Sequence, residues 1–579
     1  MKQYFPVSTF LAFTLLLLIL PLQSFAQIPT SSGTEFDVVF MENMGGGGPF
    51  EQSSLRLYLS GAVPAEVLLT DRSSGKTVTV SVPGSFATVE VSVDTLFGSA
   101  IELSAADIGI SDKVLSVTAD RAISLTGVSV RMFSADAFLC LSRNALGRRY
   151  VVLADQNGYL NTPTTGALHD MPSQFAVVAS ENNTRVTIIP SLQSKSVNGQ
   201  AAGVPFSVTL QAGQLYLGHA QLGGPNDVTG TEIMSDKPVG VFAGCRRASN
   251  PKTIGNFRDF LVEQLIPVEF WQDTFLITPF PAVEPSIKYN SIVRIISGFD
   301  TTLVSITTAT KREDHLLLSG DFLEYEVSEP LRITSTQPVM VAHYEHSVDT
   351  VINAVQVIRY GTGDPFMTLI PAPVQFQSAY TFSSVSHTEF TQHYATLILP
   401  AEKTSDIYLD SEPLPKTTKF EAIPGTEYVY ANVKVSAGEH IAILNQQLDE
   451  YEVGFGLIVY GYGMANSYGY PGGMKFPKAP SSVEEERELF ARASFTIVPQ
   501  PIHGAKGELQ LSLPTSMRLT FELYDTEGRL LRKLGEGVYC TEGGSQYQLD
   551  LEGVPSGGYF CRITGENGIA VEQSLIIQQ

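Results

Sequence analysis

The chain has 579 residues, of which 59 are acidic and 37 are Lys or Arg, so its formal net charge is -22. Nucleic acids and anionic membrane surfaces attract basic patches, so this charge argues against both as partners. A domain usually holds about 100 to 200 residues, so several domains are expected. The 49 Gly and 33 Pro residues separate short apolar runs along the whole chain, a pattern that predicts an all-β protein.

Residues 1–26 have the features of a secretory signal peptide. An apolar run covers residues 10–22, and the small residues Ser24 and Ala26 predict cleavage between Ala26 and Gln27. No later stretch approaches the roughly 18 uninterrupted apolar residues that a membrane-spanning helix needs. We therefore expect a mature chain without a transmembrane helix.

Alternating apolar and polar residues dominate the mature chain. Clear examples are Leu55 to Leu59, Thr77 to Val82 and Thr88 to Val93. This period of two is typical of strands with one packed and one solvated face. Amphipathic helical patterns are scarce.

One short sequence pattern occurs twice in the chain. EIMSDKPVGVF (Glu232 to Phe242) recurs as RITSTQPVMVA (Arg332 to Ala342), with Pro238 and Pro338 at the same place. Proline cannot donate to a strand ladder, so we expect each Pro at the first residue of a strand. The recurrence indicates a repeated β unit that closes on the same aliphatic strand.

Further matches surround these stretches. Leu-Ile-Pro, then an aromatic residue and a Gln, then a strand, occurs in Leu265 to Ile277 and again in Leu369 to Phe382. We predict four tandem β repeats of about 100 residues each between residues 33 and 475. They open near Phe36, Tyr150, Phe275 and Tyr380. Both a β-sandwich array and a propeller-like ring fit this period.

The C-terminal part differs in composition. Residues 476–494 are rich in Pro, Ser and charge, and they are interpreted as a linker. Residues 495–579 return to alternating strands and predict a small Ig-like β-sandwich. Cys540 and Cys561 both lie in this segment, so a disulfide between them is a hypothesis for an exported chain.

The chain shows no recognised catalytic, metal-binding or cofactor motif, so we expect neither an enzyme nor a bound cofactor. His343 and His346, and likewise His387 and His393, are interpreted as residues at strand ends. Trp271, which lies in a repeated motif, is expected to pack in the core.

The segment YGYGMANSYGYPGG, Tyr460 to Gly473, is rich in tyrosine. Tyrosine offers a large contact area at low entropic cost, so a loop of this composition suits recognition of a protein or glycan. Core packing is the competing interpretation. The residues in question are Tyr460, Tyr462, Tyr468 and Tyr470.

The repeat region resembles the N-terminal domain of the IgGFc-binding protein family. The resemblance is carried by GTEFDVVFMEN, ASENNTRVTIIP, DVTGTEIMSDKPVGVFAG, VEQLIPVEFWQDTFLITPF and VYGYGMANSYGYPGG, in that order over residues 33–475. Immunoglobulin binding belongs to particular members of this family and is not transferred to this chain.

Residues 495–579 resemble the C-terminal sorting domain of type IX secretion, known from the Bacteroidota. FTIVPQP, LTFELYDTEGRLLRKL, LDLEGVPSGGYFCRI and VEQSLIIQQ follow the family's order. The resemblance implies contact with the type IX machinery, transit through the outer membrane, removal of this domain, and release or attachment at the cell surface.

Three functions remain open at this stage. The first is a non-enzymatic surface or secreted binding protein, such as an adhesin, whose loops contact a protein or glycan. The second is a structural component of an extracellular matrix or cell coat. The third is a glycan-active hydrolase with two scattered carboxylates.

Overall fold

The computed structural model describes residues 28–578 with several gaps. The gaps are residues 44–52, 162–167, 251–257, 282–289, 348–349, 353–354, 358–361, 446–452, 478–492, 514–516, 527–528, 541–542 and 566–569. The predicted signal peptide, with Ala26 and Gln27, and most of the predicted linker lie outside the described residues. The chain divides into an N-terminal unit, Met1–Pro477, and a C-terminal unit, Lys478–Gln579, each described by itself.

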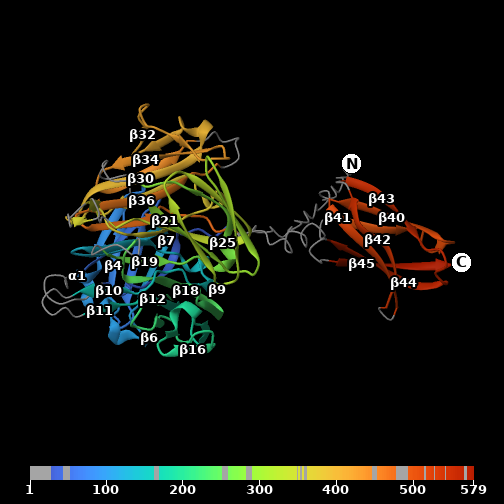
Figure 1. The fold of residues 1–579 in the computed structure, drawn as a ribbon, viewed down its shortest axis with the longest axis horizontal. Coiled ribbons are helices and arrows are strands. Elements are labelled where there is room, and N and C mark those ends of the chain that lie inside the picture. The colour runs from blue at the N-terminus through green and yellow to red at the C-terminus, as the bar shows by residue number, and fades with distance from the viewer. Residues whose placement is uncertain are drawn as a thin grey trace, which may run out of the picture. The chain divides into compact units, whose positions relative to one another are not determined.

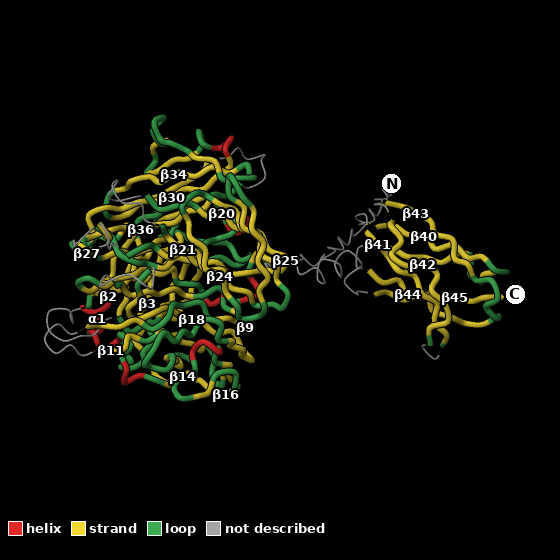
Figure 2. Tube along the Cα trace, in the orientation of Figure 1, coloured by secondary structure: helices red, strands yellow, loops and turns green. Residues whose placement is uncertain are grey.

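The structure confirms an all-β protein, since strands and loops make up nearly all of both units (Figure 2). Repeat 1 contains β1 (Gly33–Val38), β2 (Ser54–Ser60), β3 (Ala65–Asp71), β4 (Thr77–Val82), β5 (Thr88–Ser92), helix α1 (Val93–Phe97), β6 (Gly109–Ser111), β7 (Leu115–Arg131) and β8 (Ser134–Leu139). Repeat 2 contains β9 (Gly147–Val151), β10 (Gly158–Asn161), β11 (Leu168–Met171), β12 (Ser173–Ala179), β13 (Thr184–Ile189), β14 (Ser196–Val197), β15 (Gln200–Ala201), β16 (Phe206–Leu210), β17 (Leu215–His219), β18 (Glu232–Ala248) and β19 (Asp259–Gln264).

The second half of the N-terminal unit has matching elements. Repeat 3 contains β20 (Gln272–Ile277), β21 (Ser291–Ser297), β22 (Thr302–Thr307), β23 (Arg312–Leu317), β24 (Phe322–Val327), β25 (Leu331–Tyr344), β26 (Thr350–Ile352), β27 (Val355–Val357) and β28 (Met367–Leu369). Repeat 4 contains β29 (Ala379–Ser384), β30 (Phe390–Pro400), β31 (Ile407–Leu409), β32 (Glu412–Pro413), β33 (Glu421–Ala422), β34 (Tyr428–Val435), β35 (Gly438–Leu444), β36 (Gly456–Gly463) and β37 (Asn466–Pro471). Short 3-10 helices are η2 (Ser99–Ile101), η3 (Ala105–Asp107), η4 (Arg143–Ala145), η5 (Leu192–Ser194), η6 (Val268–Phe270), η7 (Pro373–Gln375) and η8 (Ala401–Lys403).

The first three repeats have the same sheet topology. The strand order β4-β3-β7-β2-β5 recurs as β16-β13-β18-β12-β17 and as β23-β22-β25-β21-β24. The long strand, which was expected to close each repeat, is central in its sheet instead. It also pairs with the first strand of its repeat, the opening strand, and with the last, which we call the closing strand. The residues Phe36, Tyr150 and Phe275 lie in these opening strands, at equivalent places.

Each long strand changes partners halfway along its length. Residues 232–235 of β18 pair with β13, whereas residues 239–245 pair with β12. Pro238 lies in the interval between the two sets, where the register against β9 also shifts. Pro338 has the same place in β25. The expectation that these prolines start strands is therefore wrong: they lie inside one strand at a bulge, where a ladder donor is dispensable.

Repeat 4 divides the long strand into two. β35 pairs with the opening strand β29 and with β31, while β36 pairs with β30 and the closing strand β37. The two halves therefore belong to separate sheets, β29-β35-β31-β32 and β33-β34-β30-β36-β37. Tyr380 lies in β29, as the repeat pattern requires.

The repeats share their cores in cyclic order. Each hydrophobic cluster of one repeat includes residues of the next: Val178, Leu217 and Phe242 of repeat 2 in the first cluster, Ile296, Met340 and Tyr344 of repeat 3 in the second, Ile458, Tyr460 and Tyr462 of repeat 4 in the third, and Tyr58, Val128 and Ala137 of repeat 1 in the fourth. The closing strands β8, β19, β28 and β37 also adjoin one another in that order. These contacts join repeat 4 to repeat 1, so blue and orange strands lie side by side (Figure 1). The N-terminal unit is therefore a closed ring of repeats.

One carboxylate joins all four repeats at the centre of the ring. Asp136, in β8 of repeat 1, is fully buried. Its oxygens accept hydrogen bonds from the backbone N–H groups of Ala137 (2.9 Å), Val262 (3.1 Å), Met367 (3.2 Å) and Gly469 (3.2 Å). Burial raises the pKa of Asp136 well above its usual range, and the four N–H groups oppose this shift.

The C-terminal unit has a separate core. Its strands are β38 (Ser494–Val498), β39 (Ile502–His503), β40 (Lys506–Leu513), β41 (Met517–Asp525), β42 (Leu530–Cys540), β43 (Gly543–Asp550), β44 (Gly557–Gly565) and β45 (Ala570–Gln578). They form a three-stranded sheet, β38-β40-β43, and a five-stranded sheet, β39-β45-β44-β41-β42. Residues of both sheets contribute to one hydrophobic cluster, which is the arrangement of a β-sandwich.

Candidate functional site

The two ends of the N-terminal unit meet in a short antiparallel pairing that we call the latch. Thr30 forms a β-bridge with Lys475. The backbone N–H of Ser31 donates to the carbonyl of Met474 at 2.9 Å, and the N–H of Phe476 donates to the carbonyl of Pro29 at 2.8 Å. The latch joins the segment before repeat 1 to the segment after repeat 4.

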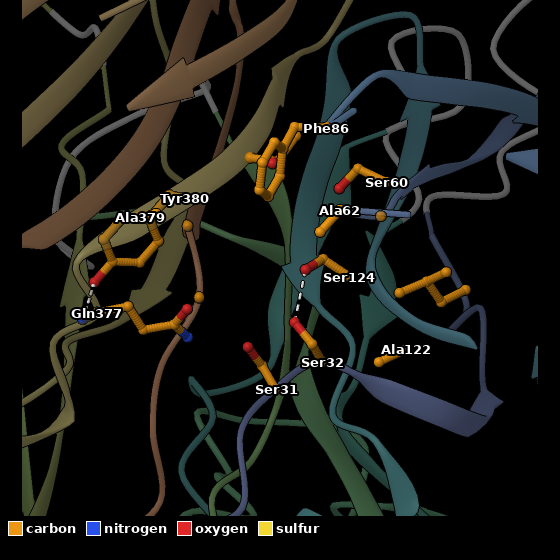
Figure 3. A pocket seen from close by; sticks show the side chains of 15 residues that line it. Ser31, Ser32, Ser60, Ala62, Phe86, Ala122, Ser124, Gln377, Ala379 and Tyr380 are labelled. Atoms are coloured by element: carbon orange, nitrogen blue, oxygen red, sulfur yellow. Dashed lines mark hydrogen bonds between the residues drawn. The ribbon is translucent and has the colours of Figure 1, made fainter. Parts of the chain in front are cut away.

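A pocket of about 220 Å³ lies beside the latch, between repeat 1 and repeat 4. We call it the seam pocket. Figure 3 shows residues of β29 on one side, residues that follow β2 on the other, and open space between them. Its lining residues are Ser31, Ser32, Ser60, Gly61, Ala62, Phe86, Ala122, Ile123, Ser124, Gln377, Ala379, Tyr380, Thr381, Gly472 and Gly473. Both ends of the N-terminal unit are therefore needed to form it.

The lining of the seam pocket is polar but carries no Asp, Glu, Lys, Arg or His. Four serines, a threonine and a glutamine supply the polar groups, and a hydroxyl can both donate and accept a hydrogen bond. The hydroxyls of Ser32 and Ser124 are 2.7 Å apart and bond to each other (Figure 3). Such a lining suits an uncharged, hydroxyl-rich ligand better than an ion.

An aromatic side chain is held in this lining by an unusual turn. Gly84, Ser85 and Phe86 follow β4, and their φ angles are 78°, 55° and 63°. A bulky residue with positive φ costs about 1 to 2 kcal/mol, so the turn must be stabilised by its surroundings. The N–H groups of Ser85 and Phe86 donate to the carbonyls of Ala62 and Gly61 at 3.1 and 3.0 Å.

The strained turn exposes an apolar ring. The side chain of Phe86 is 39% exposed, although it belongs to the lining of a pocket. At Gly84 a Cβ would lie 2.4 Å from the nitrogen of Pro64, so only glycine fits this close approach. The turn keeps Phe86 at the pocket rather than in the core.

Tyr380 forms the opposite wall and is fixed by its own hydroxyl. That hydroxyl accepts a hydrogen bond from the backbone N–H of Gln377 at 2.8 Å (Figure 3) and donates to the carbonyl of Phe455. Tyr150 of repeat 2 has the same pattern, with the N–H of Gly147 at 3.0 Å and the carbonyl of Val239 at 2.6 Å. The aromatic opening residue of these two repeats is thus a structural clamp, and burial raises the pKa of both phenols.

The structure corrects the hypothesis of a tyrosine recognition loop. Tyr460, Tyr462, Tyr468 and Tyr470 are 0 to 1% exposed, and they lie in the paired strands β36 and β37. Gly461 is paired with Tyr468, and a Cβ at Gly461 would lie 2.4 Å from that ring. The alternation of glycine and tyrosine is therefore a packing pattern, in which each glycine leaves room for a ring.

The disulfide hypothesis is also wrong in this structure. Cys540 and Cys561 are free, buried thiols. They lie in β42 and β44, on opposite sides of β41, where Cys540 is opposite Met517 and Cys561 is opposite Leu523. Two strand spacings and six positions along β41 separate them, which exceeds the Cα separation of about 7 Å that a disulfide tolerates.

His343, His393 and Trp271 are buried in the core, whereas His346 and His387 are only partly buried. The Nε2 of His343 is 2.7 Å from the hydroxyl of Ser291, and burial lowers the pKa of His343 to about 3. His393 lies 3.0 Å from the hydroxyl of Tyr468. Trp271 is 2% exposed, and its indole N–H donates to the carbonyl of Ile266 at 2.9 Å. Over the described ranges, no group of three or more His, Cys, Asp or Glu side chains is placed to hold a metal ion.

Two charged residues that join repeats were not predicted from the sequence. Arg294 of repeat 3 is 1% exposed and forms ion pairs with Asp227 (3.0 Å) and Asp155 (3.3 Å) of repeat 2. Asp136 was missed in the same way. Each is a single charge inside an apolar strand, SIVRIIS or SADAFL, and that signal marks a buried, partnered group. Phe86 was missed because nothing in its local pattern shows that its turn faces another repeat.

The fold and the seam together define a repeat protein in which copies of one β module close into a ring. The sequence profile of the family described as IgGFc binding protein matches residues 136–461, which is more than half of the chain. The chain belongs to this family. The human IgGFc-binding protein is 25% identical over 421 residues, which cover 70% of this chain and 7% of the human protein. The chain thus spans a small part of the length of that relative.

A second profile, described as a secretion system C-terminal sorting domain, matches residues 497–578. This domain directs the protein through the outer membrane to the cell surface or the medium by the type IX machinery. None of the helices in the described part of the chain is long and apolar enough to cross a membrane.

Solved structures give only distant similarity. Latent PorU from Porphyromonas gingivalis has a TM-score of 0.14 and 10% identity, over 58% of this chain and 31% of that chain. A Ca²⁺-stabilised, ice-binding adhesin of an Antarctic bacterium has a TM-score of 0.13 and 9% identity, over 70% of this chain and 94% of that chain. These scores support no argument about fold or function.

Proposed function

We propose that this protein is a non-enzymatic binding protein of the cell surface or the medium, an adhesin in the broad sense, that recognises a glycan or a protein. The seam pocket carries this proposal. It combines uncharged polar groups with an exposed aromatic ring on a rigid ring of strands, as ligand sites do. The sorting domain supports a ligand outside the cell.

The pocket favours binding over catalysis. A glycoside hydrolase needs two carboxyl groups at its site, roughly 5 to 9.5 Å apart. No carboxyl side chain lines the seam pocket. The buried carboxylate Asp136 instead accepts backbone hydrogen bonds at the centre of the ring, where it joins the repeats.

The test is binding of the full mature chain to a glycan array and to a panel of extracellular matrix proteins. We expect saturable binding that the substitution Ala62→Trp abolishes, because Ala62 is exposed at the pocket and an indole would fill it. Ala401→Trp is the matched control, since Ala401 is exposed in repeat 4 away from the lining. Binding that survives Ala62→Trp would remove the seam pocket from the proposal.

Two other outcomes would replace the proposal. No saturable binding to any member of either panel would favour a structural component of a matrix or cell coat. Release of sugar from a polysaccharide, lost on substitution of a single Asp or Glu, would favour a hydrolase.

A further inference from the structure

The seam pocket limits the size of what it can hold. Its volume is about 220 Å³. Pockets for drug-sized ligands usually have about 300 to 1,000 Å³. A folded partner or a peptide with several side chains therefore does not fit inside, whereas one sugar ring does.

The polar groups that face the pocket are available for a ligand. Within the described part of the chain, the side chains of Ser60, Gln377 and Thr381 make no hydrogen bond to other protein groups. A hydroxyl, an amide and a second hydroxyl can donate to and accept from the hydroxyl groups of a sugar. They come from both sides of the seam, because Ser60 lies in repeat 1 and the other two lie in repeat 4.

The charge around the pocket selects against ions. With no Lys, Arg or His in the lining, an anionic sugar would lose water without gaining a counter-charge. A carboxylate also lies close to the Phe86 turn and would repel an anion: the N–H of Thr88, two residues beyond Phe86, donates to a carboxylate oxygen of Glu439 at 2.8 Å. A sugar acid or a sulfated sugar is therefore disfavoured.

Phe86 supplies the remaining contact. One face of a sugar ring carries mainly C–H groups, and an exposed aromatic ring covers such a face with a large apolar area. The positive φ of Phe86 is a strained conformation that the fold retains, and strain of this kind concentrates at ligand sites.

We propose that the seam pocket binds one neutral sugar residue of a glycan, with Phe86 against its apolar face and Ser60, Thr381 and Gln377 bonded to its hydroxyl groups. This inference rests on the proposed binding function and names the ligand class of the same site. Because the ligand contacts repeat 1 and repeat 4 together, its binding also stabilises the closed ring.

The experiment uses the full chain from Gln27 to Gln579, with its sorting domain retained. The ligands are methyl glycosides of neutral hexoses and N-acetylhexosamines, with the methyl glycoside of glucuronic acid as the charged comparison. Titration calorimetry measures affinity, and differential scanning calorimetry measures unfolding. We expect at least one neutral glycoside to bind more tightly than the glucuronide. That glycoside should raise the unfolding midpoint of the N-terminal unit and leave the transition of the C-terminal unit unchanged.

Single substitutions test the contact of each side chain with the sugar separately. Phe86→Ala should lower the affinity for the neutral glycoside about tenfold or more. Phe86→Tyr keeps the aromatic ring, so its affinity should stay within about twofold of the native value. Thr381→Val keeps the shape, loses the hydroxyl and should weaken binding about fivefold. Phe560→Ala is the control, because Phe560 is similarly exposed, at 37%, in the C-terminal unit.

Three results overturn the inference. They are unchanged affinity in Phe86→Ala, preference for the glucuronide, and no binding of any methyl glycoside by a chain that does bind on the glycan array or protein panel. The last result leaves the proposed function standing and removes only the sugar assignment. A chain that binds nothing in either experiment contradicts both.

Discussion

At the scale of single residues, Asp136 shows how one side chain can organise four repeats. Its Oδ2 accepts from Val262 and Met367, and its Oδ1 accepts from Ala137 and Gly469. In Asp136→Asn an amide N–H₂ would face at least two N–H donors. We expect the free energy of unfolding of the N-terminal unit to fall by about 3 kcal/mol or more in urea titrations. Asp120→Asn is the control, since Asp120 is exposed and accepts one N–H; equal losses for both would contradict this role.

At the same scale, the buried carboxyl group of Glu345 should make the stability of the N-terminal unit depend on pH. Burial raises its pKa from 4.5 to about 7, although the N–H of His346 and the hydroxyl of Tyr462 each donate to it at 2.8 Å. The folded state thus holds the proton more tightly than the unfolded state, so its stabilising effect is complete below pH 4.5 and is lost as pH rises to 7. The loss is about 3 kcal/mol.

The substitution Glu345→Gln should remove this part of the pH profile. The stability of the variant relative to the native chain should rise between pH 4.5 and 7, as measured by urea unfolding at several pH values. Parallel profiles for the two proteins would show that Glu345 does not titrate in this window.

At the scale of elements, the long strands β18 and β25 explain the repeated Pro-Val stretch. Pro238 lies between two sets of partners, so Pro238→Ala should change stability by less than about 1 kcal/mol. Val241 lies three residues further, where β12 and β19 flank the strand. Val241→Pro should lower the free energy of unfolding by about 3 kcal/mol or more. Similar effects at both positions, measured by thermal unfolding, would contradict a bulge at Pro238.

The strands also show which features of the fold a sequence pattern can predict. Alternation in Thr77 to Val82 predicts β4, and the Leu-Ile-Pro motifs correctly precede the opening strands at Phe275 and Tyr380. These features are local, because each depends on which face of one strand is packed. The partner of that face is not local. For this reason the sequence left a sandwich array and a ring equally open.

At the scale of the whole molecule, the latch makes closure testable. Deletion of residues 28–31 removes the bonds of Ser31 to Met474 and of Phe476 to Pro29. We expect the unfolding midpoint of the N-terminal unit to fall by a few degrees, with no change in the C-terminal unit, because the deletion affects only the ring. Scanning calorimetry checks this expectation, and an unchanged midpoint would show that the shared cores alone hold the ring closed.

The sequence by itself determined the all-β class, the resemblance to the IgGFc-binding family, the sorting domain and the equivalent openings of the repeats, because these depend on short motifs and on alternation along one strand. Only the tertiary structure decided that repeat 4 packs against repeat 1, that Tyr460 and its neighbours are core residues, and that Phe86 lines a pocket. Cys540 and Cys561 show the same limit, since their separation depends on the strand between them. Alternation along a strand indicates that one face of the strand is buried. The residues that cover this face come from chain segments that can lie hundreds of positions away.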